Sequence, residues 1–334
     1  MSGQDPNDRV LRVPGSLDGE RLDRALAILA DLSRSAAAAM LARRQVRVDG
    51  QVVVRGAQGV RAGSRLEMGE IPKAPRLEAD PCVEFAVAFE DPHLIVVDKP
   101  WALVVHPGAG RLEGTLVSGL LAGFPELAEL DGAEGTDPGR PGIVHRLDRG
   151  TSGLLVVARS VAALRSLRAQ MAAHTPERLY LALVHGELVG EGLIDAPLAR
   201  ATRRPDRMAV SARGRPARTR YEVLSRHREP LDSTLLVLRL ETGRTHQIRA
   251  HLEAIGHPVV GDPRYGAKRA EAGLEPGRFF LHGFSLVFEH PADGKRVSFG
   301  SALPADLVKV IGPLPQLQDL LVARQSEDRS GDRG

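Results

Sequence analysis

The sequence has a single cysteine and no long apolar run, and these two features limit the kinds of protein that it can be. Cys82 is the single cysteine among 334 residues, which excludes an internal disulfide and a zinc site built on cysteines. No apolar run is long enough to span a bilayer. The first eight residues also lack the basic region and apolar core of a secretion signal. We therefore expect a cytoplasmic protein that does not associate with a membrane.

Lysine is scarce as well, and the basic residues are almost all arginine. The chain has five lysines and 40 arginines, yet its net charge is only +3. The chain as a whole is therefore not a polycation, and the arginine preference alone does not indicate nucleic-acid binding. With 43% hydrophobic and 26% charged residues, the chain can bury full cores and is long enough for two domains.

Motifs for several common chemistries are missing. No phosphate-binding loop, dinucleotide fingerprint or metal-ligand spacing is present. His246 and His251 are five residues apart, so they do not form a paired-histidine metal site on one helix face. Residues 150–153, Gly-Thr-Ser-Gly, lack the spacing of a serine hydrolase nucleophile elbow. We therefore expect a protein without a metal or a cofactor.

The stretch 142–158, GIVHRLDRGTSGLLVVA, is the most informative part of the chain. Its two short apolar runs, each bounded by turn residues, predict two buried strands. Asp148 lies at the turn between them, among histidine and arginine side chains. Aspartate is common in turns because it makes local hydrogen bonds. Asp148 is therefore either a structural turn residue or a reactive group on a rigid scaffold.

Composition along the chain predicts two domains with polar ends. We expect a disordered start at residues 1–16 and a disordered tail at 316–334, because both are polar and charged. A small domain covers residues 17–70, and a proline-rich linker at 71–80 leads to a second domain at 81–315.

The small domain reads as two short helices and a hairpin. Apolar residues at helical spacing from Leu22 to Leu29 predict the first helix, and Ser33 can cap a second one that runs through Leu41. Residues 46–53 alternate and contain an Asp-Gly turn. Nine arginines stand against four acidic residues between positions 20 and 66. Such a face suits contact with phosphates, although a solvated arginine-rich surface has the same composition.

The second domain mixes strands and helices. Ile248, Leu252 and Ile255 share one face of a helix that follows a strand and a glycine turn. This arrangement places Arg244, His246 and Arg249 near one end of a sheet. Alternation and apolar spacing predict the other elements, which are strands at 85–89, 94–97, 177–186 and 233–241 and a helix after residue 158.

The most basic segment runs from residue 200 to residue 228. It contains ten arginines against two acidic residues. A loop or hairpin of this composition can lie along a phosphate backbone, or it can be a solvated face. It has no interleaved aromatic residues, so stacking on bases is not indicated.

The motifs together resemble one enzyme family. The run 145–148, His-Arg-Leu-Asp, followed by 151–154, Thr-Ser-Gly-Leu, is similar to the signature of the RluA family of pseudouridine synthases. The preceding residues 140–144 bring it close to the ribosomal large-subunit type D branch. The resemblance extends from about residue 17 to residue 312, and its further motifs lie at 98–100, 104–108, 242–252, 256–266 and 279–283.

The resemblance implies an α+β fold. The expected core has a mixed, largely antiparallel central sheet, flanking helices and an active-site cleft. Residues 21–23, 33–35 and 46–50 make the small domain resemble an S4 RNA-binding domain of the αL type, with Gln45 where family members often have glycine.

The resemblance also implies an activity, the isomerisation of uridine in RNA. Asp148 would be the nucleophile, and Arg249 would keep its carboxylate ionised. Tyr180 would stack on the uracil, and Arg178 stands where the family usually has lysine. No cofactor is implied. The sequence leaves open whether Asp148 attacks the ribose or C6 of the base.

The expected partner is RNA of the large ribosomal subunit, bound by a monomer. A tRNA substrate and an RNA-binding protein without catalysis remain alternatives. A glycosidase-like mechanism would need a second carboxylate, for which Glu177, Glu241 and Asp262 are the candidates. The residues expected to contact RNA are His145, Arg146, Arg244, His246, Leu281, Arg34 and Arg47.

Overall fold

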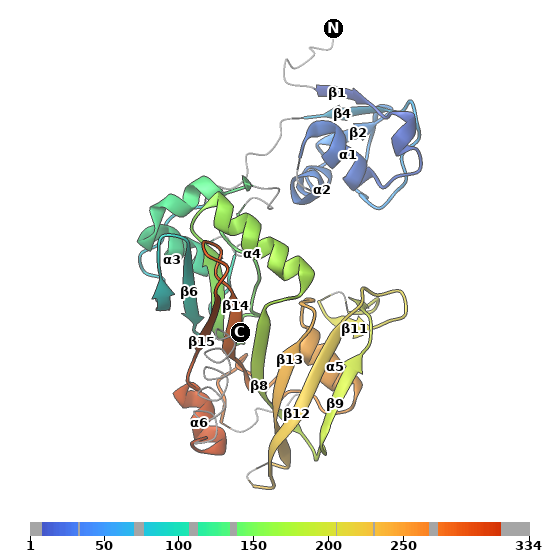
Figure 1. The fold of residues 1–334 in the computed structure, drawn as a ribbon. Helices are drawn as coiled ribbons and strands as arrows, with labels where there is room; N and C mark the ends of the chain where they lie inside the picture. Colours follow the sequence, from blue (N-terminus) through green and yellow to red (C-terminus); the bar gives the residue numbers. More distant parts are fainter. Residues whose placement is uncertain are drawn as a thin grey trace. The chain divides into compact units, whose positions relative to one another are not determined.

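The chain forms two compact units. The structure is a computed structural model that describes residues 9–32, 34–69, 77–106, 113–133, 139–204, 206–229, 231–266 and 273–314. The small unit comprises residues 1–77 with 135–140, and the large unit comprises the rest of the chain (Figure 1). Each unit has buried apolar clusters of its own.

The small unit packs two helices against a four-stranded antiparallel sheet. The predicted helices are present as α1 (Leu22–Ala30) and α2 (Arg34–Ala42). The predicted hairpin joins β2 (Val46–Val48) to β3 (Gln51–Val52), with Asp49 and Gly50 both at positive φ. This pair of positive φ angles gives the tight turn that an Asp-Gly pair favours. Ser33, the expected cap of α2, lies outside the described residues.

The predicted disordered start is wrong from residue 9 onward. Strand β1 (Arg9–Arg12) pairs with β4 (Arg65–Met68), and β4 pairs with β2. Leu11 lies opposite Leu66, and Val13 is 2% exposed in the core of the small unit. Burial of these apolar side chains offsets the entropy cost of ordering a short polar segment. Residues 1–8, most of the expected linker and the expected tail lie outside the described residues.

The large unit is built on one nine-stranded sheet. Its order is β5-β6-β7-β14-β8-β13-β12-β9, and β15 pairs with β14. Among the described strands of this sheet, the pair β7–β14 is parallel and the other pairs are antiparallel. The expected mixed, largely antiparallel sheet is therefore confirmed. The strands are β5 (Ala86–Glu90), β6 (Leu94–Lys99), β7 (Ser152–Ala158), β8 (Glu177–His185), β9 (Glu191–Asp195), β12 (Arg218–His227), β13 (Ser233–Leu240), β14 (Leu281–Glu289) and β15 (Arg296–Gly300).

The central strands β7 and β14 approach each other unusually closely at two glycines. Gly153 has φ of +117°, and a Cβ on it would lie 2.2 Å from the carbonyl oxygen of Gly283. Only glycine fits this position, because it has no Cβ and tolerates positive φ. The contact brings the loop before β7 next to the start of β14.

One of the two strands predicted around Asp148 does not form. Residues 152–158 are β7, but Ile143 makes only an isolated bridge with Val157. Gly142 has φ of +68°, and its carbonyl accepts a hydrogen bond from Ala158 N–H at 2.9 Å. The positive φ turns the chain away from an extended path, so residues 144–150 run as a loop.

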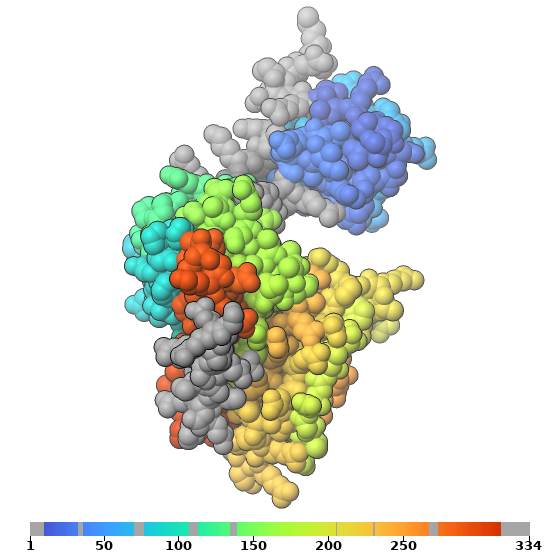
Figure 2. Space-filling view, in the orientation of Figure 1, coloured from blue at the N-terminus to red at the C-terminus, as the bar shows by residue number. Residues whose placement is uncertain are grey.

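Helix α4 (Val161–Ala173) covers one face of this sheet. Its Leu164 and Leu167 are buried against apolar side chains of β6, β7, β14 and β15. The Gln170 side chain exchanges two hydrogen bonds with the backbone of Glu289, at 2.8 and 3.0 Å. Figure 2 shows α4 beside the β14–β15 hairpin at the surface. In the part of the chain that is described, no helix is long and apolar enough to cross a membrane.

The remaining elements frame the other half of the sheet. Helix α5 (Gln247–Ala254) packs against β12 and against a short hairpin formed by β10 (Leu198–Arg200) and β11 (Met208–Val210). This hairpin occupies the start of the most basic segment. Two further helices are α3 (Leu116–Gly123) and α6 (Ala305–Ile311).

Candidate active site

A pocket of about 350 Å³, including its open mouth, lies in the large unit where the loop before β7 meets the start of α5. Seven of the ten predicted site residues line it, namely Asp148, Tyr180, Arg249, Arg146, Arg244, His246 and Leu281.

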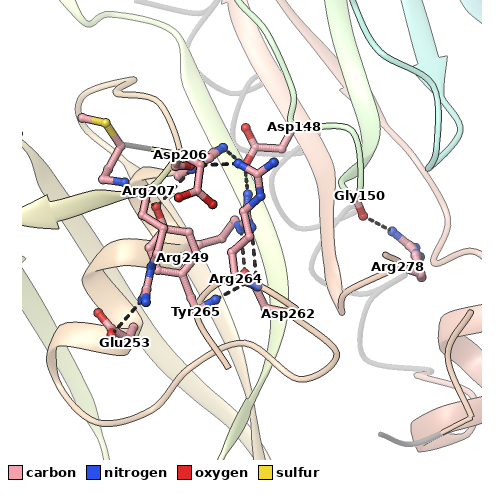
Figure 3. A network of polar contacts seen from close by, with 12 residues as sticks. Asp148, Gly150, Asp206, Arg207, Arg249, Glu253, Asp262, Arg264, Tyr265 and Arg278 are labelled. Carbon is pink, nitrogen blue, oxygen red and sulfur yellow. Dashed lines mark hydrogen bonds and ion pairs between the residues drawn. The ribbon is translucent and has the colours of Figure 1, made fainter. Parts of the chain in front are cut away.

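The loop that carries Asp148 is fixed from two sides. The Asp148 carbonyl accepts a hydrogen bond from Thr151 N–H at 3.1 Å, which closes a turn. The fully buried Arg278 donates from Nη1 to the Gly150 carbonyl at 2.9 Å (Figure 3). A Cβ on Gly150 would lie 2.3 Å from the Phe279 ring, so the loop packs directly on that ring. The carboxylate is therefore held by a rigid scaffold.

Asp148 and Arg249 form an ion pair at the pocket. Arg249 Nη1 donates to Asp148 Oδ2 at 2.8 Å. The same guanidinium donates from Nε and Nη2 to both oxygens of Asp262, at 2.6 and 2.9 Å (Figure 3). Arg249 is 4% exposed and Asp262 is fully buried. The guanidinium thus lies between two carboxylates in a site of low solvent access, where such pairs interact strongly.

The surrounding charges determine the ionisation of Asp148. Burial alone would raise the pKa of its carboxyl, but the charge and hydrogen bond of Arg249, with a smaller effect of Arg146, hold the pKa below its ordinary value. Asp148 is therefore a carboxylate at neutral pH. Oδ2 accepts the bond from Arg249, and no described residue donates a hydrogen bond to Oδ1.

Asp262 is not free to act as a second catalytic acid. Besides its two bonds with Arg249, its Oδ1 accepts hydrogen bonds from the backbone N–H groups of Arg264 and Tyr265, at 2.9 and 3.1 Å. Glu177 and Glu241 pair with arginines and do not line the pocket. The candidate carboxylates therefore do not form a glycosidase-like pair. The described residues include no group of three or more histidine, cysteine or acidic side chains that could hold a metal ion.

Two aromatic rings fix the plane of the Arg249 guanidinium. Its central carbon lies 4.9 Å from the Tyr265 ring centroid and 4.4 Å from that of Phe279. Rings at this distance attract a cation through their π faces. The sequence pattern singled out the motifs that contain Tyr265 and Phe279 but assigned these residues no role. Their nearness to Arg249 arises from the fold.

Tyr180 on β8 and Leu281 at the start of β14 form the apolar side of the pocket. A Cβ on Gly283 would lie 3.2 Å from the Tyr180 ring, so this glycine leaves room for the ring. Burial raises the pKa of the Tyr180 hydroxyl; Arg178 opposes that shift and Asp148 adds to it. The hydroxyl is therefore protonated at neutral pH.

Gln247 orders the segment that carries Arg244 and His246. Its Oε1 accepts hydrogen bonds from the Thr242 hydroxyl and from Arg244 N–H, at 2.7 and 3.0 Å. Its Nε2 donates to the Arg218 carbonyl at 2.9 Å. The sequence analysis did not predict a role for Gln247, although Gln247 lies within the family motif at 242–252.

Among the predicted site residues of the large unit, His145 does not line the pocket. His145 turns toward β7, where its Nε2 accepts a hydrogen bond from Val156 N–H at 3.1 Å. Burial and the nearby Arg178 lower the pKa of His145 to about 3, so it is a neutral residue that fastens the loop rather than a substrate contact. Arg47 is exposed on β2 of the small unit, and the side chain of Arg34 lies outside the described residues.

Comparisons with known proteins show the family to which this chain belongs. A family model described as RNA pseudouridylate synthase matches residues 93–254. The ribosomal large subunit pseudouridine synthase D of Nitrosomonas europaea is 41% identical over 97% of this chain and 92% of its own length. An uncharacterized RNA pseudouridine synthase of Chloroflexus aurantiacus is 45% identical over 96% of this chain and 98% of its own.

A solved structure supports the same assignment. The human RNA pseudouridylate synthase domain containing 1 matches with a TM-score of 0.55 and 28% identity, over 72% of this chain and 96% of its own. The relatives span nearly the whole chain at well above 30% identity. This chain therefore belongs to the RluA family of RNA pseudouridine synthases and is an enzyme of the type D kind.

Proposed function

We propose that Asp148 is the nucleophile and that the substrate is a uridine in RNA of the large ribosomal subunit. One observation supports the assignment of Asp148 as the nucleophile. Arg249 holds one oxygen of an ionised, rigidly placed carboxylate, and no described residue donates a hydrogen bond to the other oxygen. A carboxylate is a useful nucleophile only when it is ionised and held against its target. The names of the relatives support the second part.

The chemistry needs only a nucleophile and a proton acceptor. The bond between uracil N1 and ribose C1′ breaks, the base turns, and a bond forms between C5 and C1′. The proton on C5 is lost and N1 gains one, so atoms and redox level balance. Asp148 attacks either C1′ or C6, and the bond that it forms to the nucleotide breaks again before the product leaves. Tyr180 lies against the base and orients it.

Access to the pocket requires the uridine to leave its stack. Extrusion of a base costs a few kcal/mol, and less in a loop than in a duplex. Arg146 is exposed beside Asp148, and Arg244 lines the pocket while its Nε donates to the Pro216 carbonyl at 3.1 Å. These two guanidinium groups can neutralise phosphates flanking the extruded nucleotide.

The variant Asp148→Asn tests the nucleophile. We expect the purified protein to keep its fold and its RNA affinity and to form no pseudouridine, because the amide is neutral and a poor nucleophile. Asp195→Asn is the matched control, since Asp195 is exposed on β9, and it should retain full turnover. Pseudouridine formation by Asp148→Asn would refute the assignment.

Mapping of pseudouridines identifies the substrate RNA. In a strain that lacks this gene, we expect one or more sites of large-subunit rRNA to remain uridine, and the wild-type gene should restore them. The Asp148→Asn gene should not restore them. Loss of modification in tRNA alone, with rRNA unchanged, would replace the rRNA proposal with the tRNA alternative.

A further inference from the structure

We propose that Tyr265 is a positioning residue that fixes the tautomer of His246 and ties it to the β10–β11 hairpin. The inference rests on the proposed role of Asp148, because His246 faces that carboxylate. It extends the site to a residue that contributes no atom to the pocket lining.

The hydroxyl group of Tyr265 has two polar contacts among the described residues. It accepts a hydrogen bond from Met208 N–H at 2.7 Å and lies 3.0 Å from Nδ1 of His246. A backbone N–H can only donate, and Nδ1 of His246 is the one acceptor beside the hydroxyl among the described residues, so we assign the hydroxyl proton to the contact with Nδ1. A neutral imidazole that accepts at Nδ1 carries its own proton on Nε2.

The electrostatic surroundings favour the neutral form of His246. Burial lowers the pKa of its imidazole, the carboxylate of Asp148 opposes this shift, and Arg249 and Arg264 add to it. The net shift is downward, so His246 is uncharged at neutral pH. The site then contains one neutral donor next to the ion pair instead of a second cation.

The Nε2 atom of His246 lies near the reacting carboxylate without binding it. Nε2 lies 4.0 Å from Oδ2 of Asp148, which is too long for a direct hydrogen bond. Oδ2 is already held by Arg249. The N–H group therefore remains available to an acceptor oxygen of the nucleotide that enters the pocket. Fixing the proton on Nε2 gives the site this donor before the substrate arrives.

The ring of Tyr265 connects the same residue to the basic hairpin. Its centroid lies 4.6 Å from the guanidinium carbon of Arg207 and 4.9 Å from that of Arg249. Arg207 also pairs with Glu253 of α5 at 2.9 Å, and Arg264 donates to the Asp206 carbonyl at 2.8 Å (Figure 3). Residues 206–208 are thus fastened to Tyr265 and α5 by backbone, ion-pair and cation–π contacts.

This geometry couples the hairpin to the pocket. The hairpin begins the segment with ten arginines, which suits an RNA backbone. A shift of Met208 would break its hydrogen bond with the Tyr265 hydroxyl and leave the hydroxyl free to move away from Nδ1 of His246. The position of the hairpin thereby controls whether the proton of the His246 ring is held on Nε2.

Nitrogen NMR of the ring tests the tautomer without RNA or turnover. The wild-type protein, labelled with ¹⁵N-histidine, should show His246 as the Nε2–H form, and His246→Asn assigns its signals. In Tyr265→Phe we expect a mixture of tautomers, whereas Tyr221→Phe removes a hydroxyl on β12 and should leave the tautomer unchanged. An Nδ1–H form in the wild type, or an unchanged tautomer in Tyr265→Phe, would overturn the proposal. If the variant does not fold, the wild-type measurement still tests the proposal, because an Nδ1–H form there would overturn it.

Single-turnover kinetics test the consequence. Tyr265→Phe should slow pseudouridine formation about tenfold, equivalent to about 1.4 kcal/mol, with little change in the Kd for RNA. Tyr221→Phe makes the same change on β12, away from the pocket, and should leave the rate unchanged. Equal rates for wild type and Tyr265→Phe would refute the positioning role. Failure of the nucleophile assignment would instead appear as activity in Asp148→Asn, with the His246 tautomer unaffected.

Discussion

Arg249 binds two carboxylates at once, and the two have different roles. Asp262 holds the arginine in place, and Asp148 is the group proposed to react. Asp262 takes two of its N–H groups and is fully buried, while Asp148 takes a third and faces the pocket. The pair of Arg249 and Asp262 therefore acts as a support for Asp148. A change at Asp262 should damage stability and turnover together, unlike a change at Asp148.

We predict that Asp262→Asn lowers the free energy of unfolding by about 3–5 kcal/mol, the usual cost of breaking a buried ion pair. It should also reduce turnover, because Arg249 loses the partner that fixes its direction toward Asp148. Urea denaturation and a pseudouridine assay measure the two effects. Asp195→Asn, at a site 60% exposed, should change the free energy of unfolding by less than about 1 kcal/mol. A stable Asp262→Asn protein with normal turnover would contradict the support role.

At the scale of elements, the contact between β7 and β14 holds the loop of Asp148 against the pocket. We predict that Gly153→Ala destabilises the protein by about 1–3 kcal/mol, because the new Cβ would lie 2.2 Å from the Gly283 carbonyl oxygen at an unfavourable φ. Thermal unfolding measures the change. Gly123→Ala in α3 is the control, since its Cβ would meet nothing within 4 Å, and it should be neutral or stabilising. Equal melting temperatures for wild type and Gly153→Ala would show that the strands can separate at no cost.

Most elements were predictable because their patterns are local. Helical spacing and alternation predicted α1, β6, β8 and β13 close to their observed bounds, and they predicted that helices occur where α4 and α5 lie. Strand β1 was missed because it has only four residues, two of them charged at the ends, and owes its order to β4 far along the chain. The run at 142–144 was overpredicted because the positive φ of Gly142 cannot be read from apolar content.

Site residues could be predicted from the sequence only where a family motif contains a residue with a known role. The resemblance selected Asp148, Tyr180 and Arg249, and the fold brings all three to one pocket. It could not give the direction of a side chain, so His145 was expected at the substrate although it bonds to β7. Asp262 was considered only as a second acid, because a carboxylate in a turn has the same sequence signature whether it reacts or supports an arginine.

At the scale of the whole molecule, two histidines that the fold keeps neutral make stability depend on pH. The pKa is about 3 for His145 and about 4 for His282, in both cases mainly because of burial, against an ordinary value of 6.5. Below pH 6.5 the unfolded chain therefore binds more protons than the folded one. As the pH is lowered from 6.5 to about 4, the free energy of unfolding should therefore decrease, by about 1.4 kcal/mol per pH unit for each histidine.

Urea denaturation between pH 7 and pH 5 measures this slope. His282→Gln should reduce it by the share of one histidine, because glutamine does not titrate. His174→Asn is the control, since His174 is exposed at the end of α4, and it should leave the slope unchanged. An identical slope in wild type and His282→Gln would show that His282 is not kept neutral by the fold.

The small unit has its own core and a strong excess of arginine, so its contribution to RNA binding can be removed separately. Arg43 and Arg47 are exposed there. We predict that the double variant Arg43→Gln/Arg47→Gln weakens binding of rRNA. Binding would then make fewer phosphate contacts and would release fewer counterions from the RNA. The slope of log K against log salt should become shallower by about 0.7–0.9 per lost contact. Deletion of residues 1–70 should weaken binding further while the large unit still folds. Unchanged affinity and salt slope in both variants would mean that the arginines of this unit are only a solvated surface.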